Sequence, residues 1–330
     1  METGTVVRAA RYHATGIPAD VLQVDEITLP PPAPGQVRVR MLAAPINPAD
    51  LNMLEGKYGE SRPLPDVPGN EGVGRVLATG DGVPSDWLGQ QVLVDSEAWR
   101  EQGNWDVSGL VRVPDTIAPR DAAFLRVNPP TAWRLLHDFV PLQPGDWIVQ
   151  NLAGSSVGRA VIEIARRRGW KTLNVVRRPE AAEELRALGA DAVLVDGPSL
   201  AEEFGAVLGG VKPKLALNAV GGAAATRLAG LLATGGTMVT YGAMSKEALK
   251  IPNGFLIFRD ISFRGFWLTR WLRGAGEEVR KEMFDGIFTL AEEGLFRPPV
   301  TAEFPLGQVS KAVAAASEGA RGKILLHLGD

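Results

Sequence analysis

The sequence contains no cysteine among its 330 residues and only three histidines, His13, His137 and His327, which are widely scattered. Disulfide bonds, thiolate nucleophiles and zinc sites with sulfur ligands are therefore excluded. Because disulfides are rare where the surroundings keep thiols reduced, a cytoplasmic location is the simplest expectation.

Long apolar runs and an excess of one charge are also lacking. The formal net charge is -3 and both signs are interspersed, so we expect neither a nucleic acid nor an anionic membrane as partner. No apolar run approaches the ~18 to 20 residues of a membrane helix, and the opening "METGTVVRAARYHATG" lacks the apolar block of a signal peptide. These absences favour a small, soluble ligand.

The chain shows two patterns that change near residue 127, and its length exceeds the usual size of one domain. Before that point, short β-like runs are broken by proline and glycine clusters. In "QVRVRMLAA", for example, Val37 and Val39 alternate with Arg38 and Arg40. This pattern predicts a small all-β domain. After residue 127, strands alternate with helices, which predicts an α/β fold with a parallel, doubly wound sheet.

The elements of the second part can be placed individually. "QPGDWIVQN" predicts a turn and a buried strand, and "SSVGRAVIEIARRRG" predicts an amphipathic helix that ends at Gly169. "KTLNVV" is the next strand, and a second helix runs from Pro179 to Gly189. Further apolar strands are "DAVLVD", "LALNAV" and "TMVTYG", with a helix-like "AATRLAGLLA" before the last.

The turn "NLAGSSVGRA" lies where a doubly wound sheet binds a dinucleotide phosphate. Gly154 and Gly158 are present, but the G-x-G-x-x-G fingerprint is degenerate, and Gly158 could equally serve close packing of helix on strand. Arg177 and Arg178 follow the second strand, where an NAD site would carry an acidic residue. Guanidinium groups there suit a 2′-phosphate and favour NADPH, although two solvated surface charges are the alternative.

Several longer motifs carry a family resemblance. They are "INPADLNMLEGKYG", "PGNEGVGRV", "VNPPTAWRLL", "LNVVR", "GGTMVTYGAM" and "RGFWL". In this order they resemble the mitochondrial-type trans-2-enoyl thioester reductases of the medium-chain dehydrogenase/reductase superfamily. The resemblance implies a GroES-like catalytic domain at 1–126, a Rossmann NADPH-binding domain at 127–268, and a C-terminal segment, 269–330, that returns to complete the catalytic domain.

The polar pair Asn70 and Glu71 in "PGNEGVGRV" bears on metal binding. In the zinc-dependent alcohol dehydrogenases of the superfamily the corresponding stretch reads G-H-E, and its histidine binds the catalytic metal. Here that position is Asn70, and no cysteine is available for the other ligands, so we expect no metal site of that type. We expect Glu71 to be a structural carboxylate, hydrogen-bonded to nearby backbone or paired with an arginine.

The resemblance implies that a tyrosine protonates the α-carbon after hydride transfer, and the matching residue is Tyr58 in "EGKYG". From the residues alone, a tyrosine on a Gly-flanked loop is more often a packing or interface residue. Asn47 in "INPAD" could orient Tyr58 or a ribose, and a turn role beside Pro48 is equally plausible.

The resemblance also implies a set of NADPH-contacting positions. They are Asn128, Gly154, Ser155, Ser156, Val157, Gly158, Arg177, Arg178, Tyr241, Gly242, Ala243, Met244, Phe266, Trp267, Leu268 and Lys323. Two positions depart from the family pattern. Arg-Asp-Arg is common after the second strand where this chain has Arg177, Arg178 and Pro179, and a glycine is common at Ser156.

Three functions remain open at the level of sequence. The first is NADPH-dependent reduction of the C=C bond of trans-2-enoyl thioesters, carried either by coenzyme A or by acyl carrier protein. The second is an NADPH:quinone oxidoreductase of the same superfamily, which needs no tyrosine acid. The third is a non-catalytic NADPH-binding protein. The superfamily habit of pairing sheet edges, here near "ISFRGFWL", implies a homodimer.

Overall fold

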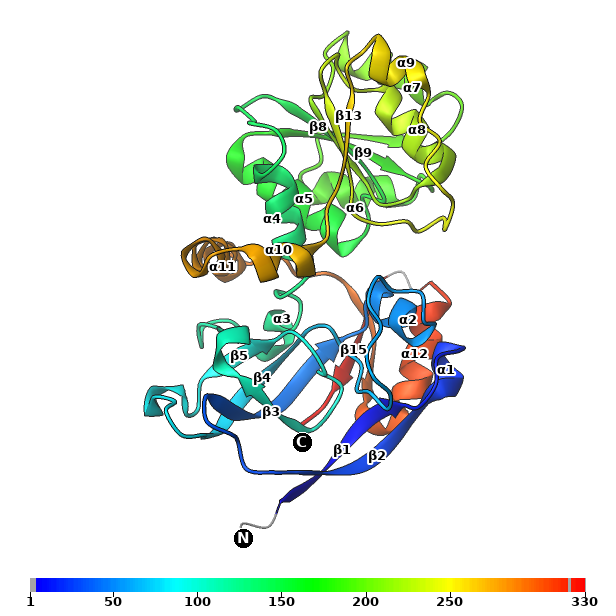
Figure 1. Ribbon diagram of the computed structural model, residues 1–330. Helices are drawn as coiled ribbons and strands as arrows, with labels where there is room; N and C mark the ends of the chain where they lie inside the picture. The colour runs from blue at the N-terminus through cyan, green and yellow to red at the C-terminus, as the bar shows by residue number, and fades with distance from the viewer. Residues whose placement is uncertain (1–3, 320–321, 330) are drawn as a thin grey trace. The chain divides into compact units, whose positions relative to one another are not determined.

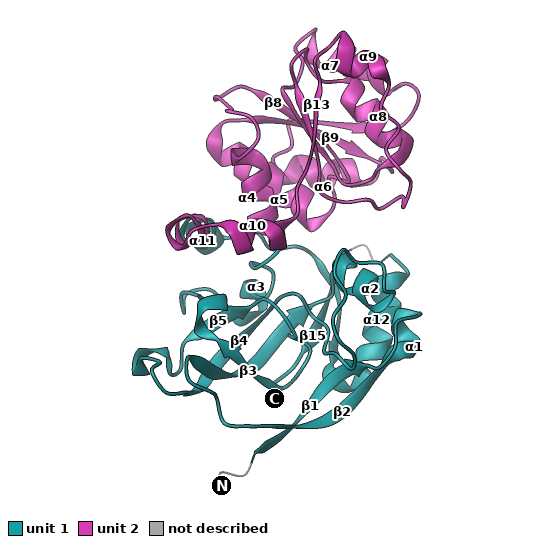
Figure 2. Cartoon of the chain, viewed as in Figure 1, with its two compact units in different colours: residues 1–127, 284–330 teal, residues 128–283 magenta. Residues whose placement is uncertain are grey.

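The computed structural model describes residues 4–319 and 322–329, which fold as two compact units (Figure 2). The first unit contains residues 1–127 and 284–330, and the second contains residues 128–283. From the sequence, we expected the C-terminal segment to return to the first unit at residue 269. In the structure this segment begins at Phe284. The intervening helix α10 (Leu268–Gly274) belongs to the second unit, where Trp271 stacks under the Arg134 guanidinium at 4.5 Å.

The first unit is built on a seven-stranded sheet in the order β14-β15-β3-β4-β5-β7, with β6 paired to β3, and on a separate β1-β2 hairpin (Figure 1). Its strands are β1 (Thr5–Tyr12), β2 (Leu22–Leu29), β3 (Gln36–Pro45), β4 (Gly72–Thr79), β5 (Gln91–Val94), β6 (Gln102–Asp106), β7 (Val111–Arg112), β14 (Val300–Pro305) and β15 (Lys323–His327). Its helices are α1 (Pro18–Val21), α2 (Pro48–Leu54), α3 (Pro119–Ala122), α12 (Val309–Ser317) and the 3-10 turns Ser85–Trp87, Val107–Gly109 and Leu306–Gln308.

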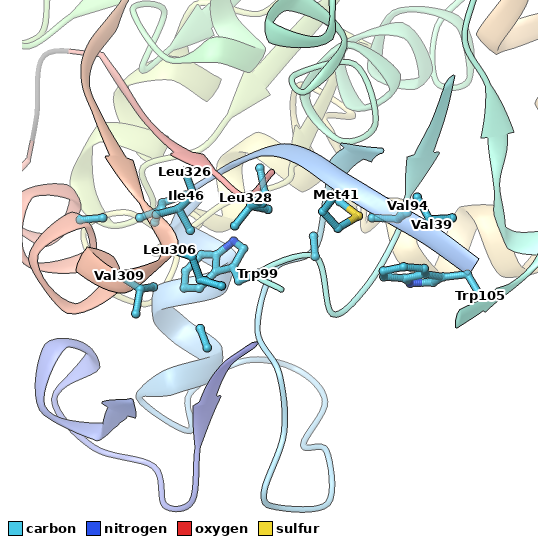
Figure 3. Packing of buried hydrophobic residues seen from close by; sticks show 14 of the residues in the cluster. Val39, Met41, Ile46, Val94, Trp99, Trp105, Leu306, Val309, Leu326 and Leu328 are labelled. Atoms are coloured by element: carbon cyan, nitrogen blue, oxygen red, sulfur yellow. The ribbon is translucent and has the colours of Figure 1, made fainter. Parts of the chain in front are cut away.

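The C-terminal segment completes this sheet, because β15 pairs antiparallel with β3. Figure 3 shows Leu306, Val309 and Leu326 from this segment packed with Ile46 and Trp99 from the N-terminal part. All five side chains are buried, so the segments from the two ends of the chain share one hydrophobic core. The first unit therefore depends on both.

The second unit is a six-stranded parallel sheet in the order β10-β9-β8-β11-β12-β13. Its strands are β8 (Trp147–Asn151), β9 (Lys171–Val176), β10 (Ala192–Val195), β11 (Leu215–Asn218), β12 (Thr237–Thr240) and β13 (Ser262–Gly265). Its helices are α4 (Asn128–His137), α5 (Ser156–Arg168), α6 (Ala181–Leu188), α7 (Leu200–Leu208), α8 (Gly222–Gly230), α9 (Asn253–Ile257), α10 and the first part of α11 (Glu277–Glu292). The order reverses between β8 and β11, so the carboxyl ends of these strands form the switch point of a doubly wound sheet.

Local sequence signals account for the main elements of this unit. The strands β8, β9 and β11 are almost entirely buried, as strands covered by helices on both faces should be. Helices α5 and α6 end at Gly169 and Gly189, which adopt left-handed φ values of 70° and 113°. The strands and helices expected at these positions are thus observed.

Among the described residues, no helix is long and apolar enough to cross a membrane.

Candidate active site

Tyr58 lies in the first unit, directly after helix α2. The helix starts at Pro48, with Asn47 as its N-cap residue. At its other end, the Gly56 amide donates to the Met53 carbonyl at 3.0 Å and the Lys57 amide donates to the Asn52 carbonyl at 2.8 Å. Tyr58 is half-buried and is the residue after Lys57. The orientation of α2 therefore determines the position of the Tyr58 backbone.

The loop that carries Tyr58 is also fixed at its far end. Asp66 and Tyr12 exchange two backbone hydrogen bonds at 3.1 and 3.2 Å, and the Tyr12 hydroxyl donates to Asp66 Oδ2 at 3.1 Å. Burial, together with the Asp66 charge, raises the pKa of Tyr12 to about 12. Tyr12 therefore keeps its proton at neutral pH and acts as a clamp on the loop. Sequence analysis did not identify this pair, which is 54 residues apart.

The structure brings Asn47 and Lys323 together, although they are 276 residues apart. The Lys323 ammonium donates a hydrogen bond to Asn47 Oδ1, and the Asn47 Nδ2 donates to Glu71 Oε1 at 2.7 Å. Asn47 thus has the helix-start role that its position beside Pro48 allowed. The described contact of Lys323 lies within the first unit, and its contact with a cofactor stays a prediction.

Asn70 and Glu71 serve different partners. The backbone and side-chain amides of Asn70 donate to Asp50 Oδ1 at 2.9 and 2.7 Å. Glu71 Oε2 accepts from the Val127 amide at 2.9 Å. Glu71 is therefore hydrogen-bonded to backbone, which is one of the two alternatives expected, and the positive charge of Lys323 also acts on it. Asp50 was overlooked, although an acidic residue three positions after Asn47 is a known signal of a helix start.

Burial dominates the electrostatics of this cluster. Glu71 and Asp50 are fully buried, which raises the pKa of Glu71 to about 7 and that of Asp50 to about 6. Lys323 and the hydrogen bonds from Asn47 and Asn70 oppose these shifts. Burial also lowers the pKa of Lys323, against the attraction of the two carboxylates. The protonation of the cluster is therefore sensitive to pH near neutrality.

Among the described residues, no group of three or more histidine, cysteine, aspartate or glutamate side chains could hold a metal ion. A catalytic zinc normally takes three such protein ligands. At the position where zinc-dependent relatives have a histidine, Asn70 is bonded to Asp50 instead. The side chains that the structure describes do not fit a zinc site of that kind.

In the second unit, the turn between β8 and α5 contains two glycines with different roles. A Cβ atom on Gly158 would lie 2.5 Å from the Ala153 carbonyl oxygen, so this glycine permits close packing of the helix on the turn. A Cβ atom on Gly154 would meet nothing within 4 Å, and Gly154 is exposed. Ser155 caps α5 by accepting from the Gly158 amide at 3.1 Å. An open turn before a helix N-terminus is suited to a phosphate group.

Arg177 and Arg178 follow β9 and are exposed. Neither guanidinium makes a hydrogen bond or ion pair with any residue that the structure describes. An unengaged guanidinium at the carboxyl end of the second strand can bind the 2′-phosphate of NADPH without first breaking a contact within the protein.

A ladder of buried polar side chains fixes the carboxyl ends of β8, β11 and β12. The Asn151 Nδ2 donates to Asn218 Oδ1 at 2.8 Å, and the Asn218 Nδ2 donates to Thr240 Oγ1 at 3.1 Å. Tyr241 follows, and its buried hydroxyl lies beside Ser155 without a hydrogen bond of normal geometry to any described residue. Burial raises the pKa of Tyr241, so the hydroxyl is a neutral donor at the switch point.

The remaining predicted cofactor positions are distributed over the second unit. Asn128 is buried at the start of α4. Ser156 and Val157 open α5, Gly242 and Ala243 follow Tyr241, and Met244 is 54% exposed. Phe266 and Trp267 connect β13 to α10, which begins at Leu268. Contact of these residues with NADPH stays a prediction.

Two protein-family models match the two units. An alcohol dehydrogenase GroES-like domain matches residues 33–111, and a zinc-binding dehydrogenase model matches residues 156–285. Together with the parallel sheet and the returning C-terminal segment, they define a member of the medium-chain dehydrogenase/reductase superfamily, and they confirm the expected fold class.

Within that superfamily, the chain belongs to the family of mitochondrial-type enoyl-acyl-carrier-protein reductases. It is 42% identical to the mouse protein of that name over 319 residues, which cover 94% of this chain and 85% of the relative. Identity to the Caenorhabditis elegans protein is 40% over 327 residues, covering 96% and 93% of the two chains. The resemblance inferred from the motifs is confirmed.

Solved structures of reductases also superpose on nearly the whole chain. A putative NADPH:quinone reductase from Bacillus thuringiensis superposes with a TM-score of 0.92 at 30% identity, covering 98% of this chain and 99% of the other. The Etr1p complex with NADP and crotonyl-CoA superposes with a TM-score of 0.89 at 27% identity, covering 98% and 100%. The mitochondrial 2-enoyl thioester reductase Etr1p/Etr2p heterodimer from Candida tropicalis has the same TM-score, identity and coverages.

Proposed function

We propose that the protein is an NADPH-dependent oxidoreductase that reduces the C=C bond of trans-2-enoyl thioesters. The observation that carries this proposal is the similarity to enoyl reductases over nearly the whole chain, which includes the segment around Tyr58. The structure adds that Tyr58 stands at the end of a helix whose start is fixed by buried hydrogen bonds. A fixed proton donor is what the second half of this reaction needs.

We assign cofactor binding to the second unit. NADPH supplies the hydride, which is added at the β-carbon of the enoyl thioester. The open turn at Gly154 and the α5 N-terminus would hold the pyrophosphate, and Arg177 and Arg178 would hold the 2′-phosphate. The unengaged guanidinium groups and the neutral hydroxyl of Tyr241 fit a polyanionic ligand.

We assign the proton donor to the first unit. Addition of hydride leaves negative charge on the thioester carbonyl as an enolate, and this charge is removed when the α-carbon is protonated. Tyr58 is the donor that we assign to this step, either directly or through a water that it orients. We assign Asn47 a supporting part, because its amide oxygen and nitrogen are bonded to Lys323 and Glu71.

A second candidate function is NADPH:quinone reduction. It is favoured by the similarity to the putative quinone reductase from Bacillus thuringiensis, whose sequence identity of 30% exceeds the 27% of Etr1p. Quinone reduction does not protonate carbon and gives no role to Tyr58. The two functions therefore differ in what they require from the same fold.

The test is the rate of NADPH oxidation with crotonyl-CoA and, separately, with a simple benzoquinone. The proposal expects efficient turnover of crotonyl-CoA and formation of butyryl-CoA. Turnover of the quinone alone would support the second candidate. Absence of turnover with either substrate, despite NADPH binding, would indicate the non-catalytic alternative.

The acyl carrier and the assembly are finer proposals. Coenzyme A and acyl carrier protein both remain possible handles, and parallel assays with crotonyl groups on each distinguish them. We propose a homodimer formed through the edge strand β13. Nearby in the chain, Ile257 at the end of α9 and Phe258 directly after it are 70% and 82% exposed, and such an apolar surface is typical of an interface.

A cytoplasmic location stays a proposal that rests on the absence of cysteine. The enoyl reductases to which the chain is similar carry the designation mitochondrial. Cell fractionation followed by detection of the protein decides between the two compartments.

A further inference from the structure

A buried cluster of Asn47, Asp50, Glu71 and Lys323 surrounds the start of α2 in the first unit. Each of these side chains is at most 8% exposed. With both carboxylates ionised and the lysine charged, the cluster carries one excess negative charge away from water. Such an arrangement is unfavourable unless each charged group has close hydrogen-bond partners, and the structure provides them.

Glu71 has the hydrogen-bond geometry of an ionised carboxylate. Its Oε1 accepts from the Asn47 Nδ2 at 2.7 Å, and its Oε2 accepts from the Val127 amide at 2.9 Å. A proton on either oxygen would weaken the hydrogen bond that this oxygen accepts from its N–H donor. The Asn47 amide cannot turn over to compensate, because its Oδ1 accepts from the Lys323 ammonium, which has no acceptor to offer in return.

The same asparagine connects Glu71 to Tyr58. Asn47 caps α2, and its backbone amide donates to Asp50 Oδ2 at 2.7 Å. The helix has only seven residues, and the Lys57 amide is still bonded to it when the chain reaches Tyr58. A shift at the start of so short a rigid helix is therefore transmitted to its end.

We propose that Glu71 is a positioning residue for enoyl thioester reduction: as a carboxylate it holds Asn47 at the start of α2, and thereby holds Tyr58 in its reactive position. This inference rests on the proposed function, in which Tyr58 donates the proton. Protonation of Glu71 would release Asn47 or Val127 and loosen the helix start. Loss of this hydrogen bond should then lower kcat more than it weakens substrate or NADPH binding.

Two charged groups that act on Glu71 are Lys323 from β15 and Asp50 from α2. Burial is the largest influence and raises the pKa of Glu71 to about 7. The ionised Glu71 side chain that holds Asn47 is therefore present above about pH 7 and is lost as the pH falls below this value. Enoyl reduction should therefore rise with pH through about 7.

The experiment measures kcat for crotonyl-CoA at saturating NADPH as a function of pH. Wild-type protein should lose activity below about pH 7. Glu71→Gln, which mimics the protonated acid, should have kcat lower by on the order of tenfold to a hundredfold at alkaline pH and should lack this titration. The dissociation constant for NADPH should stay near the wild-type value. The control Asp86→Asn removes an exposed carboxylate of the same unit, which pairs with Arg112, and should keep the wild-type profile.

Lys323→Met gives a second, independent readout. Removing the cation that favours the Glu71 carboxylate should move the titration to higher pH by about 1 to 3 units. Should Glu71→Gln fail to fold, this shift decides the matter.

The outcomes distinguish failure of the Glu71 role from failure of the proposed function. If the wild type is active and Glu71→Gln keeps the wild-type pH profile, the role of Glu71 is overturned and the proposed function stands. The same holds if the titration does not move in Lys323→Met. A wild type that does not reduce crotonyl-CoA overturns the proposed function, and the role of Glu71 with it.

Discussion

Substitution of Tyr58 by phenylalanine separates catalysis from stability. The change removes one hydroxyl from a half-buried side chain and leaves the ring in place. Loss of a single hydrogen bond changes the free energy of unfolding by about 0.5 to 1.5 kcal/mol. Loss of general acid catalysis lowers the rate by about 10² to 10⁴. At about 1.36 kcal/mol per decade, this corresponds to a barrier increase of roughly 2.7 to 5.4 kcal/mol, well above the stability effect.

The assay compares kcat for crotonyl-CoA with kcat for a quinone in the same protein preparation. Tyr58→Phe should lower the first by the stated factor and leave the second, along with the NADPH dissociation constant, near the wild-type values. Tyr12→Phe is the matched control, because it removes a tyrosine hydroxyl that hydrogen-bonds to Asp66 in the same unit, while the two backbone hydrogen bonds between Tyr12 and Asp66 still hold the loop. It should lower the unfolding temperature and leave kcat close to the wild-type value. Full enoyl reductase activity in Tyr58→Phe would refute the assignment of the acid.

Further predictions concern the cofactor, the turn, the metal and the assembly. Alanine at both Arg177 and Arg178 should weaken NADPH binding by one to two decades, since a charge-assisted contact is worth about 1.5 to 3 kcal/mol, and should leave NADH binding unchanged in fluorescence titrations; equal weakening of both would contradict it. Gly158→Ala should destabilise the protein by about 1 to 3 kcal/mol in denaturant unfolding, because the new Cβ would lie 2.5 Å from the Ala153 carbonyl oxygen. Unchanged stability would show that the turn shifts to make room for the Cβ atom. Elemental analysis of active protein should find no stoichiometric zinc, and zinc whose removal abolishes turnover would overturn the expectation. Phe258→Ser should shift the protein toward monomer in light scattering, and an unchanged mass would argue against the β13 edge.

Much of the second unit could be predicted from the sequence, because its signals are local. The apolar face of α5, the stop at Gly169 and the buried strand "KTLNVV" each depend on a few neighbouring residues. The division at Phe284 had no such signal. It falls inside α11, whose helical pattern continues through it, so composition does not change at that point.

The candidate site was predictable only in part, for a related reason. Its residue types were found, since Tyr58, Asn47, Arg177 and Arg178 lie in short recognisable motifs. The partners were not, because Lys323 meets Asn47 across 276 residues of chain. Hydrophobic periodicity reports which residues are buried but not which buried polar groups meet.

The most direct test of the central claim is the fate of deuterium from NADPH deuterated at the transferring position of C4. The account predicts that crotonyl-CoA is converted to butyryl-CoA with one deuterium at carbon 3, found by mass spectrometry and NMR, and with a solvent proton at carbon 2. Unconverted crotonyl-CoA, or label at carbon 2, would contradict it.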